Sequence, residues 1–141
     1  RAIDTSETEV LLTARSEGFV VGRPDLAETI KRLVAYAEAG ADCLYAPGVR
    51  TLGDVTAIVD AVAPRPVNVL ATGDHFTVDQ LAKAGVRRIS VGGALARAAW
   101  TGFIAAAREI SELGSFGQLG VALPSSAIEA SFEPGRVAEV P

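Results

Sequence analysis

Between residues 9 and 113, a short apolar run is followed by a helical stretch four times in succession. The four runs occupy residues 10–14, 42–46, 67–71 and 86–91. Short, largely apolar runs of this length are typical of strands that are buried on both faces of a parallel sheet. Because strand and helix alternate along the chain, each helix returns the chain for the next parallel strand. The sequence therefore predicts an α/β fold built from parallel βα units.

The helical stretches carry clear start and stop signals. Asp25 lies at the start of the first stretch and Thr51 can cap the second, while Thr77 and Gln80 form a capping box before the third. Glycines suited to a left-handed C-terminal turn follow the first and last stretches, at positions 40 and 114. These signals predict helices near 26–37, 52–62, 78–84 and 94–113.

Length and texture leave the complete architecture open. We expect a single domain or a fragment, with the four βα units at 9–113 and a short helix near 127–132 plus a loose tail in 114–141. A doubly wound sheet fits the 141 residues, whereas a (β/α)8 barrel needs about 250 residues, so these units would be half of one. The first residue, Arg1, is not Met, which favours a fragment. Both architectures place their chemistry at the carboxyl ends of the strands.

Composition excludes several classes of function. The net charge is −4 and the thirteen Lys and Arg residues are scattered, so we expect no nucleic-acid partner. No apolar stretch is long enough to cross a membrane and no leader precedes the first strand, so we expect no membrane partner. A single cysteine, Cys43, fits a reducing compartment, and we expect a cytoplasmic protein. With one Cys and one His, a zinc site of thiolates and imidazoles is excluded, and any metal would be a hard cation bound by oxygen.

Three polar features stand at the predicted strand ends. Arg15 presents a planar fork suited to a carboxylate or phosphate, although an ion pair with Glu17 would also account for it. Asn68 interrupts an apolar strand, where it would bind a substrate oxygen or a neighbouring backbone group. Ser90 precedes Gly92 and the helix that follows; such a turn can cradle an anion or simply be tight, and it lacks both the dinucleotide fingerprint and the P-loop lysine.

Four segments together resemble the isocitrate lyase/phosphoenolpyruvate mutase superfamily, particularly its less characterised bacterial branch. They are LTARSE at 12–17, AGADCLYAPG at 39–48, PVNVL at 66–70 and GVRRISVG at 85–92. The segments occur in the order and spacing of that superfamily, and the likeness runs from about residue 9 to 113.

The resemblance implies that the chain is the C-terminal half of a TIM (β/α)8 barrel, strands five to eight, with an extra C-terminal helix. It also implies a Mg²⁺-dependent enzyme that acts on C–C or P–C bonds of small 2-oxo or hydroxy carboxylates through an enolate-like intermediate. By the same resemblance, Arg15 binds a substrate carboxylate or phosphonate and Asn68 helps to hold a carboxylate. We expect Ser90 or Gly92 at the rim of the same site.

Two departures qualify these implications. Lyases of the superfamily often carry a glutamate at the end of the sixth strand, where this chain has Ala46, Pro47 and Gly48. The superfamily's metal-binding aspartates and its mobile catalytic loop belong to the first half of the barrel. We therefore expect no metal ligands in this chain, and the identity of the substrate and the choice among lyase, mutase and hydrolase stay open.

Two other functions compete with this hypothesis. The chain could be a non-catalytic half-barrel fragment, or a small α/β domain that binds a phosphorylated ligand at Gly92 and Gly93. The resembled superfamily exchanges its eighth helix between neighbouring barrels, and the helix at 94–113 occupies that place. We therefore expect a homo-oligomer with helix exchange, with Trp100 and Phe103 among the contacts between subunits.

Overall fold

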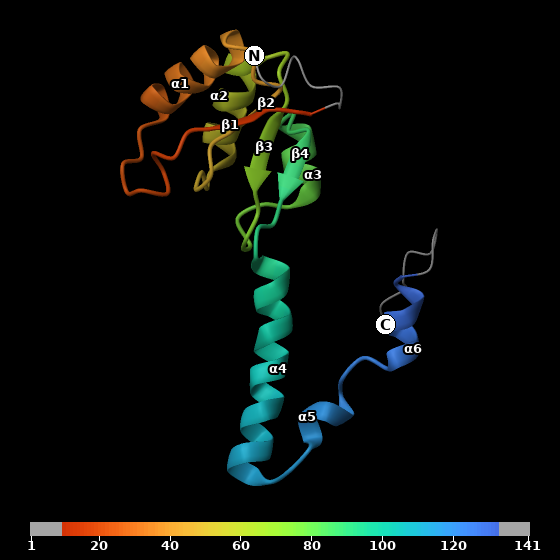
Figure 1. Ribbon diagram of the computed structural model, residues 1–141. Helices are drawn as coiled ribbons and strands as arrows, with labels where there is room; N and C mark the ends of the chain where they lie inside the picture. Colours follow the sequence, from red (N-terminus) through yellow and green to blue (C-terminus); the bar gives the residue numbers. More distant parts are fainter. Residues whose placement is uncertain (1–9, 133–141) are drawn as a thin grey trace. The chain divides into compact units, whose positions relative to one another are not determined.

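The computed structural model describes residues 10–132 and divides the chain into two compact units (Figure 1). The first unit ends at Gly92 and the second begins at Gly93. The tail expected from residue 133 onward lies outside the described residues. None of the described helices is long and apolar enough to cross a membrane.

The first unit is a parallel sheet whose strands are connected by helices (Figure 1). Its strands are β1 (Thr13–Arg15), β2 (Cys43–Tyr45), β3 (Val67–Leu70) and β4 (Arg88–Ser90). Its helices are α1 (Leu26–Glu38), α2 (Leu52–Val62) and α3 (Val78–Lys83). All three strand pairs are parallel, which confirms the predicted α/β fold.

The order of the strands decides between the two architectures that the sequence allows. The strands lie in the order β1-β2-β3-β4, without a reversal. A doubly wound sheet reverses its order at a switch point, so that helices cover both faces. When right-handed crossovers always move in the same direction, every helix lies on one face, as in a (β/α)8 barrel. The unit therefore has the topology of a barrel segment.

The hydrophobic core lies between one face of the sheet and these helices. Successive strand residues point to opposite faces. The residues that meet the helix layer include Leu44, Val67 and Val69 from the strands, and they pack with Leu33 of α1 and Ile58 of α2. Their strand neighbours point to the opposite face, which we call the far face. By this alternation and the register, the far face carries the strand residues Thr13, Arg15, Cys43, Tyr45, Asn68, Leu70, Arg88 and Ser90.

The first strand begins later than the apolar run predicts. The run starts at Val10, but β1 covers only Thr13–Arg15, and the residues from Val10 to Leu12 are exposed. The amide of Leu12 donates to the Asp42 carboxylate at 2.8 Å, so a side chain occupies it at the start of the strand. At its other end, β1 extends to Arg15, which is its last residue.

The predicted helix boundaries are largely confirmed, because local hydrogen bonds set them. The side chains of Asp25 and Thr51 each accept a backbone N–H of the first turn. Thr77 and Gln80 form the full capping box of α3. Gly40, with φ of 99°, supplies the left-handed turn after α1.

In the second unit, a carboxylate near the end of the long helix binds the segment that follows it. It contains α4 (Ala94–Leu113), α5 (Gly117–Gly120) and α6 (Ser125–Ala130), and the last of these overlaps the expected short helix. Glu109 Oε1 accepts hydrogen bonds from Ser115 Oγ at 2.6 Å and Gly117 N at 2.7 Å, and Oε2 accepts one from Gln118 N at 2.7 Å. Glu109 thereby fastens the start of α5 to α4.

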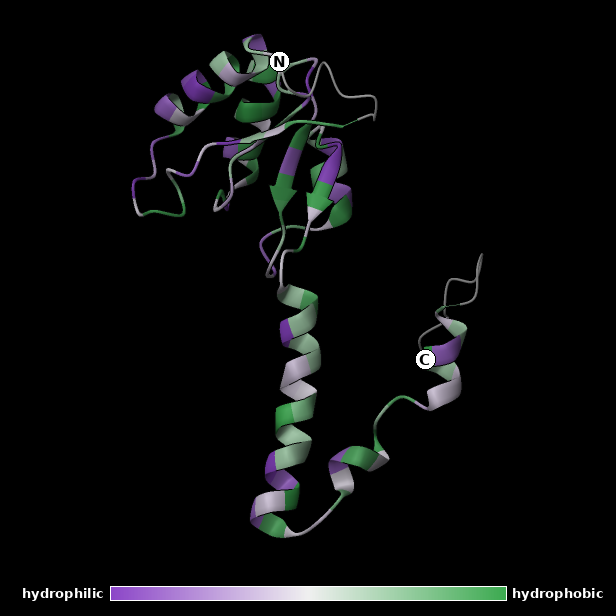
Figure 2. Ribbon diagram, viewed as in Figure 1, coloured by the Kyte–Doolittle hydropathy of each residue, from purple (hydrophilic) through white to green (hydrophobic). Residues whose placement is uncertain are grey.

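Exposed large apolar residues recur along α4, and Figure 2 shows hydrophobic positions at intervals along the same helix. No residue of α4 is buried. The rings of Trp100 and Phe103 meet edge to face, with their centroids 5.1 Å apart, and more than half of each residue's surface is exposed. Exposed aromatic pairs of this kind are enriched where proteins associate.

The Glu109 contacts predict an acid-sensitive turn between α4 and α5. The Ser115 hydroxyl and then the backbone N–H groups of Gln118 and Gly117 lower the pKa of Glu109 from its ordinary 4.5. A lowered pKa means that the contacts are complete above 4.5 and are lost as the pH falls through the lower value. We expect the amide resonances of Gly117 and Gln118 to shift toward random-coil positions in that acidic range. Glu109→Gln should produce much of this shift at neutral pH, whereas the control Glu112→Gln, on the same helix, should not.

Candidate functional site

The register of the sheet aligns four side chains across the far face. Arg15 pairs with Tyr45, Tyr45 pairs with Asn68, and Asn68 pairs with Arg88 on successive strands. Ser90 lies two residues beyond Arg88 and therefore on the same face. Arg15, Tyr45 and Ser90 are the last residues of their strands, the end at which α/β proteins place their chemistry. Asn68 is the second residue of β3, and Arg88 is the first residue of β4.

Arg15 is held at the edge of this row by two partners. Its guanidinium carbon lies 4.9 Å from the centre of the Tyr45 ring, in cation–π contact. Its Nη2 lies 2.8 Å from Glu17 Oε1, and about half of each side chain is exposed. The ion pair that the sequence left as an alternative is therefore present. One contact with Glu17 still leaves most of the five N–H donors of the guanidinium for a ligand.

Asn68 is the most buried polar residue of the row, with 1% of its surface exposed. Its Nδ2 donates to Ser90 Oγ at 2.9 Å, so the two predicted residues are in direct contact. Its Oδ1 is buried and has no hydrogen-bond partner among the described residues. A buried acceptor without a donor is costly, which marks this atom as a place for a donor from a ligand or from another segment.

Gly92 completes the set of predicted residues, two positions after Ser90. Its φ of 51° lies in the left-handed region, where glycine is favoured. A Cβ built on it would lie 3.5 Å from Leu70 Cδ1, an ordinary contact. The backbone conformation, rather than lack of space, therefore requires glycine in this turn.

The residues that the structure describes do not form a binding site for a metal ion. Within residues 10–132, no group of three or more His, Cys, Asp and Glu side chains could hold a metal ion. The carboxylate nearest the row, Glu17, is paired with Arg15. No step of the chemistry can therefore be assigned to a metal held by these residues.

The sequence analysis missed two members of the row. Tyr45 precedes the Pro47 turn, and its contact with Arg15 becomes visible only once the two strands are in register. Arg88 is exposed on the far face opposite Asn68. The signal that could have found both is the alternation of sides along each short strand, counted from Arg15 and Asn68.

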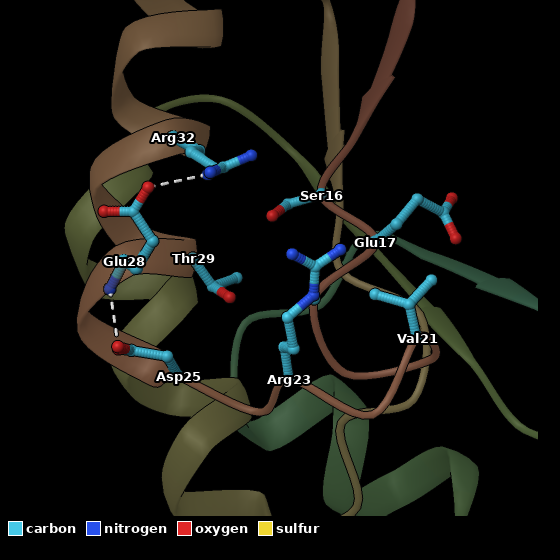
Figure 3. A pocket seen from close by; sticks show the side chains of 9 residues that line it. Ser16, Glu17, Val21, Arg23, Asp25, Glu28, Thr29 and Arg32 are labelled. Atoms are coloured by element: carbon cyan, nitrogen blue, oxygen red, sulfur yellow. Dashed lines mark hydrogen bonds and ion pairs between the residues drawn. The ribbon is translucent and has the colours of Figure 1, made fainter.

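A cavity also lies beside β1, away from this row (Figure 3). Its volume is about 410 Å³, and it is formed by the loop between β1 and α1 together with the first two turns of α1. Neither Arg15 nor Asn68 lines it. The two residues share a face of the sheet, which this cavity does not reach.

Comparison with known proteins gives one family and several solved structures. Residues 1–111 match the model of a family described as phosphoenolpyruvate phosphomutase. A crystal structure assigned as a lyase/mutase from Burkholderia cenocepacia J2315 is 45% identical, with a TM-score of 0.85 over 94% of this chain and 49% of that chain. A second protein of that organism, assigned as a phosphonomutase, is 32% identical, with a TM-score of 0.68 over 81% of this chain and 46% of that one.

A more distant structure shares the fold. Oxaloacetate acetylhydrolase, in complex with the inhibitor 3,3-difluorooxalacetate, is 24% identical, with a TM-score of 0.70 over 84% of this chain and 41% of that chain. No curated relative matches the chain. The chain spans about half the length of the structures it matches.

The contact between Asn68 and Ser90 predicts a measurable loss of stability in Ser90→Ala. Removing the hydroxyl leaves Asn68 Nδ2 without its acceptor, and an unsatisfied buried polar group costs about 1–3 kcal/mol. Urea unfolding should show that decrease in the free energy of unfolding. Thr72→Ala, an exposed loop position after β3, should change it by about 0.5 kcal/mol or less. Equal stability of Ser90→Ala and the unmodified protein would contradict the assigned hydrogen bond.

Proposed function

The chain belongs to the phosphoenolpyruvate phosphomutase family, within the isocitrate lyase/phosphoenolpyruvate mutase superfamily, and from that membership we propose an enzyme acting on small 2-oxo or hydroxy carboxylates. The proposed reaction makes or breaks a C–C or P–C bond through an enolate-like intermediate. Relatives assigned as a lyase/mutase and a phosphonomutase support this reaction class. Because the chain spans about half of their length, the activity belongs to a site that the rest of a barrel would complete.

The observation that carries the proposal is that Arg15, Asn68 and Ser90 share the far face, with Arg15 and Ser90 at the carboxyl ends of their strands. The structure brings Asn68 and Ser90 into hydrogen-bond contact and places Arg15 on the same face, one strand beyond Tyr45. Far-face residues of a (β/α)8 barrel point into its interior, and the loops at this end form the active site.

Arg15 is the residue that we propose to bind the substrate anion. A guanidinium fork matches a carboxylate or phosphonate, and charge-assisted pairs of this kind are the stronger hydrogen bonds. The Tyr45 ring beneath the guanidinium restricts its orientation. A clamp of this kind orients the anion, while fixed donors stabilise the negative charge that develops as the bond to the enolate carbon breaks.

Asn68 and Ser90 act as a pair in this proposal. Because Asn68 Nδ2 is occupied by Ser90 Oγ, the amide is fixed and Oδ1 is the atom left free. A carbonyl oxygen accepts a hydrogen bond, so Oδ1 would receive one from a substrate hydroxyl or from a protonated carboxyl group. Gly92 would line the rim beyond Ser90.

We propose Mg²⁺ as the cofactor on the strength of the family alone. The described residues offer no cluster that fits the ion, so its ligands would come from the other half of the barrel. The same finding keeps a non-catalytic half-barrel as the second candidate. The third candidate, a small doubly wound domain with a phosphate at Gly92 and Gly93, is disfavoured by the sequential strand order. A cytoplasmic location is part of the proposal and is supported by the single, unpaired Cys43.

We further propose that the protein is a homo-oligomer in which α4 is exchanged between neighbouring barrels. The exposed apolar residues of α4 support this assembly, and the set includes Leu95, Trp100, Phe103 and Ile104. β1 and β4, at the two ends of the described sheet, each pair with one strand only, and free strand edges seek a partner.

Arg15→Gln should lower substrate binding and turnover together. Removing a charge-assisted clamp is expected to reduce kcat/KM by about tenfold to a hundredfold. The assay uses the protein together with the other half of its barrel, and it follows cleavage of oxaloacetate and rearrangement of phosphoenolpyruvate in the presence of Mg²⁺. Arg65→Gln, an exposed position at the amino end of β3, is the matched control and should retain activity. Activity of Arg15→Gln equal to that of the control would contradict the assignment, and no turnover by the unmodified protein would favour the non-catalytic candidate.

Trp100→Glu should weaken the proposed assembly. A charged side chain replaces the centre of the apolar strip on α4, and loss of a central interface aromatic is expected to raise the dissociation constant by about thirtyfold or more. Sedimentation velocity should show an oligomer for the unmodified protein and for the control Arg108→Gln. A monomer of the unmodified protein at micromolar concentration would contradict the proposal and would indicate that α4 packs within its own subunit.

A further inference from the structure

The cavity beside β1 is a built, polar site that the proposed reaction does not use (Figure 3). It has a volume of about 410 Å³. The residues that line it come from the β1–α1 loop and from α1: Ser16, Glu17, Gly18, Val21, Arg23, Asp25, Glu28, Thr29 and Arg32.

The cavity lies on the opposite side of β1 from the proposed substrate site. Ser16 follows Arg15 directly, and its amide donates to Tyr45 O at 2.9 Å, which continues the ladder between β1 and β2. Neighbouring residues of an extended strand point to opposite faces, so Ser16 faces the helix layer while Arg15 faces the far face. The cavity and the row of site residues are therefore separate places.

Backbone hydrogen bonds fix the loop that closes the cavity. Arg23 N donates to Gly18 O at 2.9 Å, and Val21 N donates to Glu17 O at 3.2 Å. A Cβ at Gly18 would lie only 3.0 Å from Arg23 O, so the closed loop leaves no room for a side chain there. The loop thereby holds Arg23 over the start of α1.

The carboxylates around the cavity are already bound by other groups. Asp25 Oδ1 accepts the Glu28 amide at 2.9 Å, and Glu28 Oε1 accepts Arg32 Nε at 2.8 Å. Glu17 is paired with Arg15, and its side chain points away from the cavity in Figure 3. Arg15 and Arg32 thereby balance the charges of Glu17 and Glu28, while a backbone N–H holds the Asp25 carboxylate.

The groups left over are hydrogen-bond donors. The Arg23 guanidinium points into the cavity between Ser16 and Thr29, and it makes no ion pair within residues 10–132 (Figure 3). Ser16 and Thr29, which are 3% and 2% exposed, bring two hydroxyl-bearing side chains to the same lining. The terminal nitrogens of Arg32 face the same space from α1 (Figure 3).

We propose that this cavity binds a phosphate-type oxyanion, as inorganic phosphate or as the phosphoryl group of a small phosphate ester. Arg23, Arg32 and the two hydroxyls approach from different elements, and together they offer more donors than the two oxygens of one carboxylate can accept. A tetrahedral oxyanion with three or four free oxygens uses donors from all of these directions. The hydroxyls of Ser16 and Thr29 can donate to the same oxyanion.

Isothermal titration calorimetry of the purified protein with inorganic phosphate, in chloride at constant ionic strength, tests the proposal. We expect saturable binding with a dissociation constant of about a millimolar or tighter. Arg23→Gln should weaken binding about tenfold, because it removes a charge-assisted hydrogen bond. Thr29→Val should weaken it about threefold, because valine has the shape of threonine but lacks the hydroxyl. The control Arg65→Gln should bind phosphate like the unmodified protein.

Circular dichroism of each variant separates loss of the site from loss of the fold. If Arg23→Gln does not fold, Thr29→Val and Ser16→Ala carry the test, and a loss of affinity in a folded variant supports the site. Absence of saturable binding would overturn the proposal. The proposal would also be overturned if folded Arg23→Gln and Thr29→Val both bound phosphate as tightly as the unmodified protein, because phosphate would then be bound elsewhere. Repeating the titration with glycerol phosphate distinguishes a phosphate ester from the free ion as the favoured ligand.

Discussion

The alternation of side chains along four very short parallel strands is the constraint on which the rest of the structure depends. Each strand has only three or four residues, so each contributes one or two side chains to either face. Apolar residues such as Leu44, Val67 and Val69 meet the helices and form the core. The residues between them, Tyr45 and Asn68, are thereby brought to the far face, where they stand next to each other in the register. The same alternation of side chains therefore produces both the core and the candidate site.

The sequential order of the strands determines that none of the unit's described helices covers the far face. If the order had reversed, helices would cover both faces, and a buried amide with a free oxygen would have no open side to serve. Because the order runs β1 to β4 without reversal, the far face corresponds to the interior of a barrel. Asn68 Oδ1 is buried there and has no hydrogen-bond partner within residues 10–132, which fits a face that a ligand or a further part of the barrel completes.

The elements of the fold could be predicted from the sequence because their signals are local. Caps such as Thr51 and Thr77 act within one helical turn, and Asn68 and Arg15 stand out as polar residues in apolar strands. The strand order could not be predicted, because periodicity is the same in a barrel and in a doubly wound sheet. Tyr45 was missed because its role depends on the register. The extent of the domains, and the binding role of Arg15, Asn68, Ser90 and Gly92, stay predictions.

The cavity beside β1 could not be predicted for a related reason. Its residues are spread over a loop and a helix, and they meet only because Arg23 N closes the loop onto Gly18 O. Nothing in the sequence indicates that Ser16 and Thr29 line the same cavity, since they lie in different segments. Contacts of this kind arise from the path of a loop, which hydrophobic periodicity does not describe.

A crystal structure of the purified protein with oxalate and Mg²⁺ tests the central claim most directly, namely that the far face of the sheet is the substrate side of the site. Oxalate is a small dicarboxylate that resembles the proposed substrate class. The account predicts that a carboxylate of oxalate lies within hydrogen-bond distance of the Arg15 guanidinium, on the same face as Asn68 and Ser90. Oxalate bound on the helix side of the sheet, with Arg15 still paired only with Glu17, would contradict it.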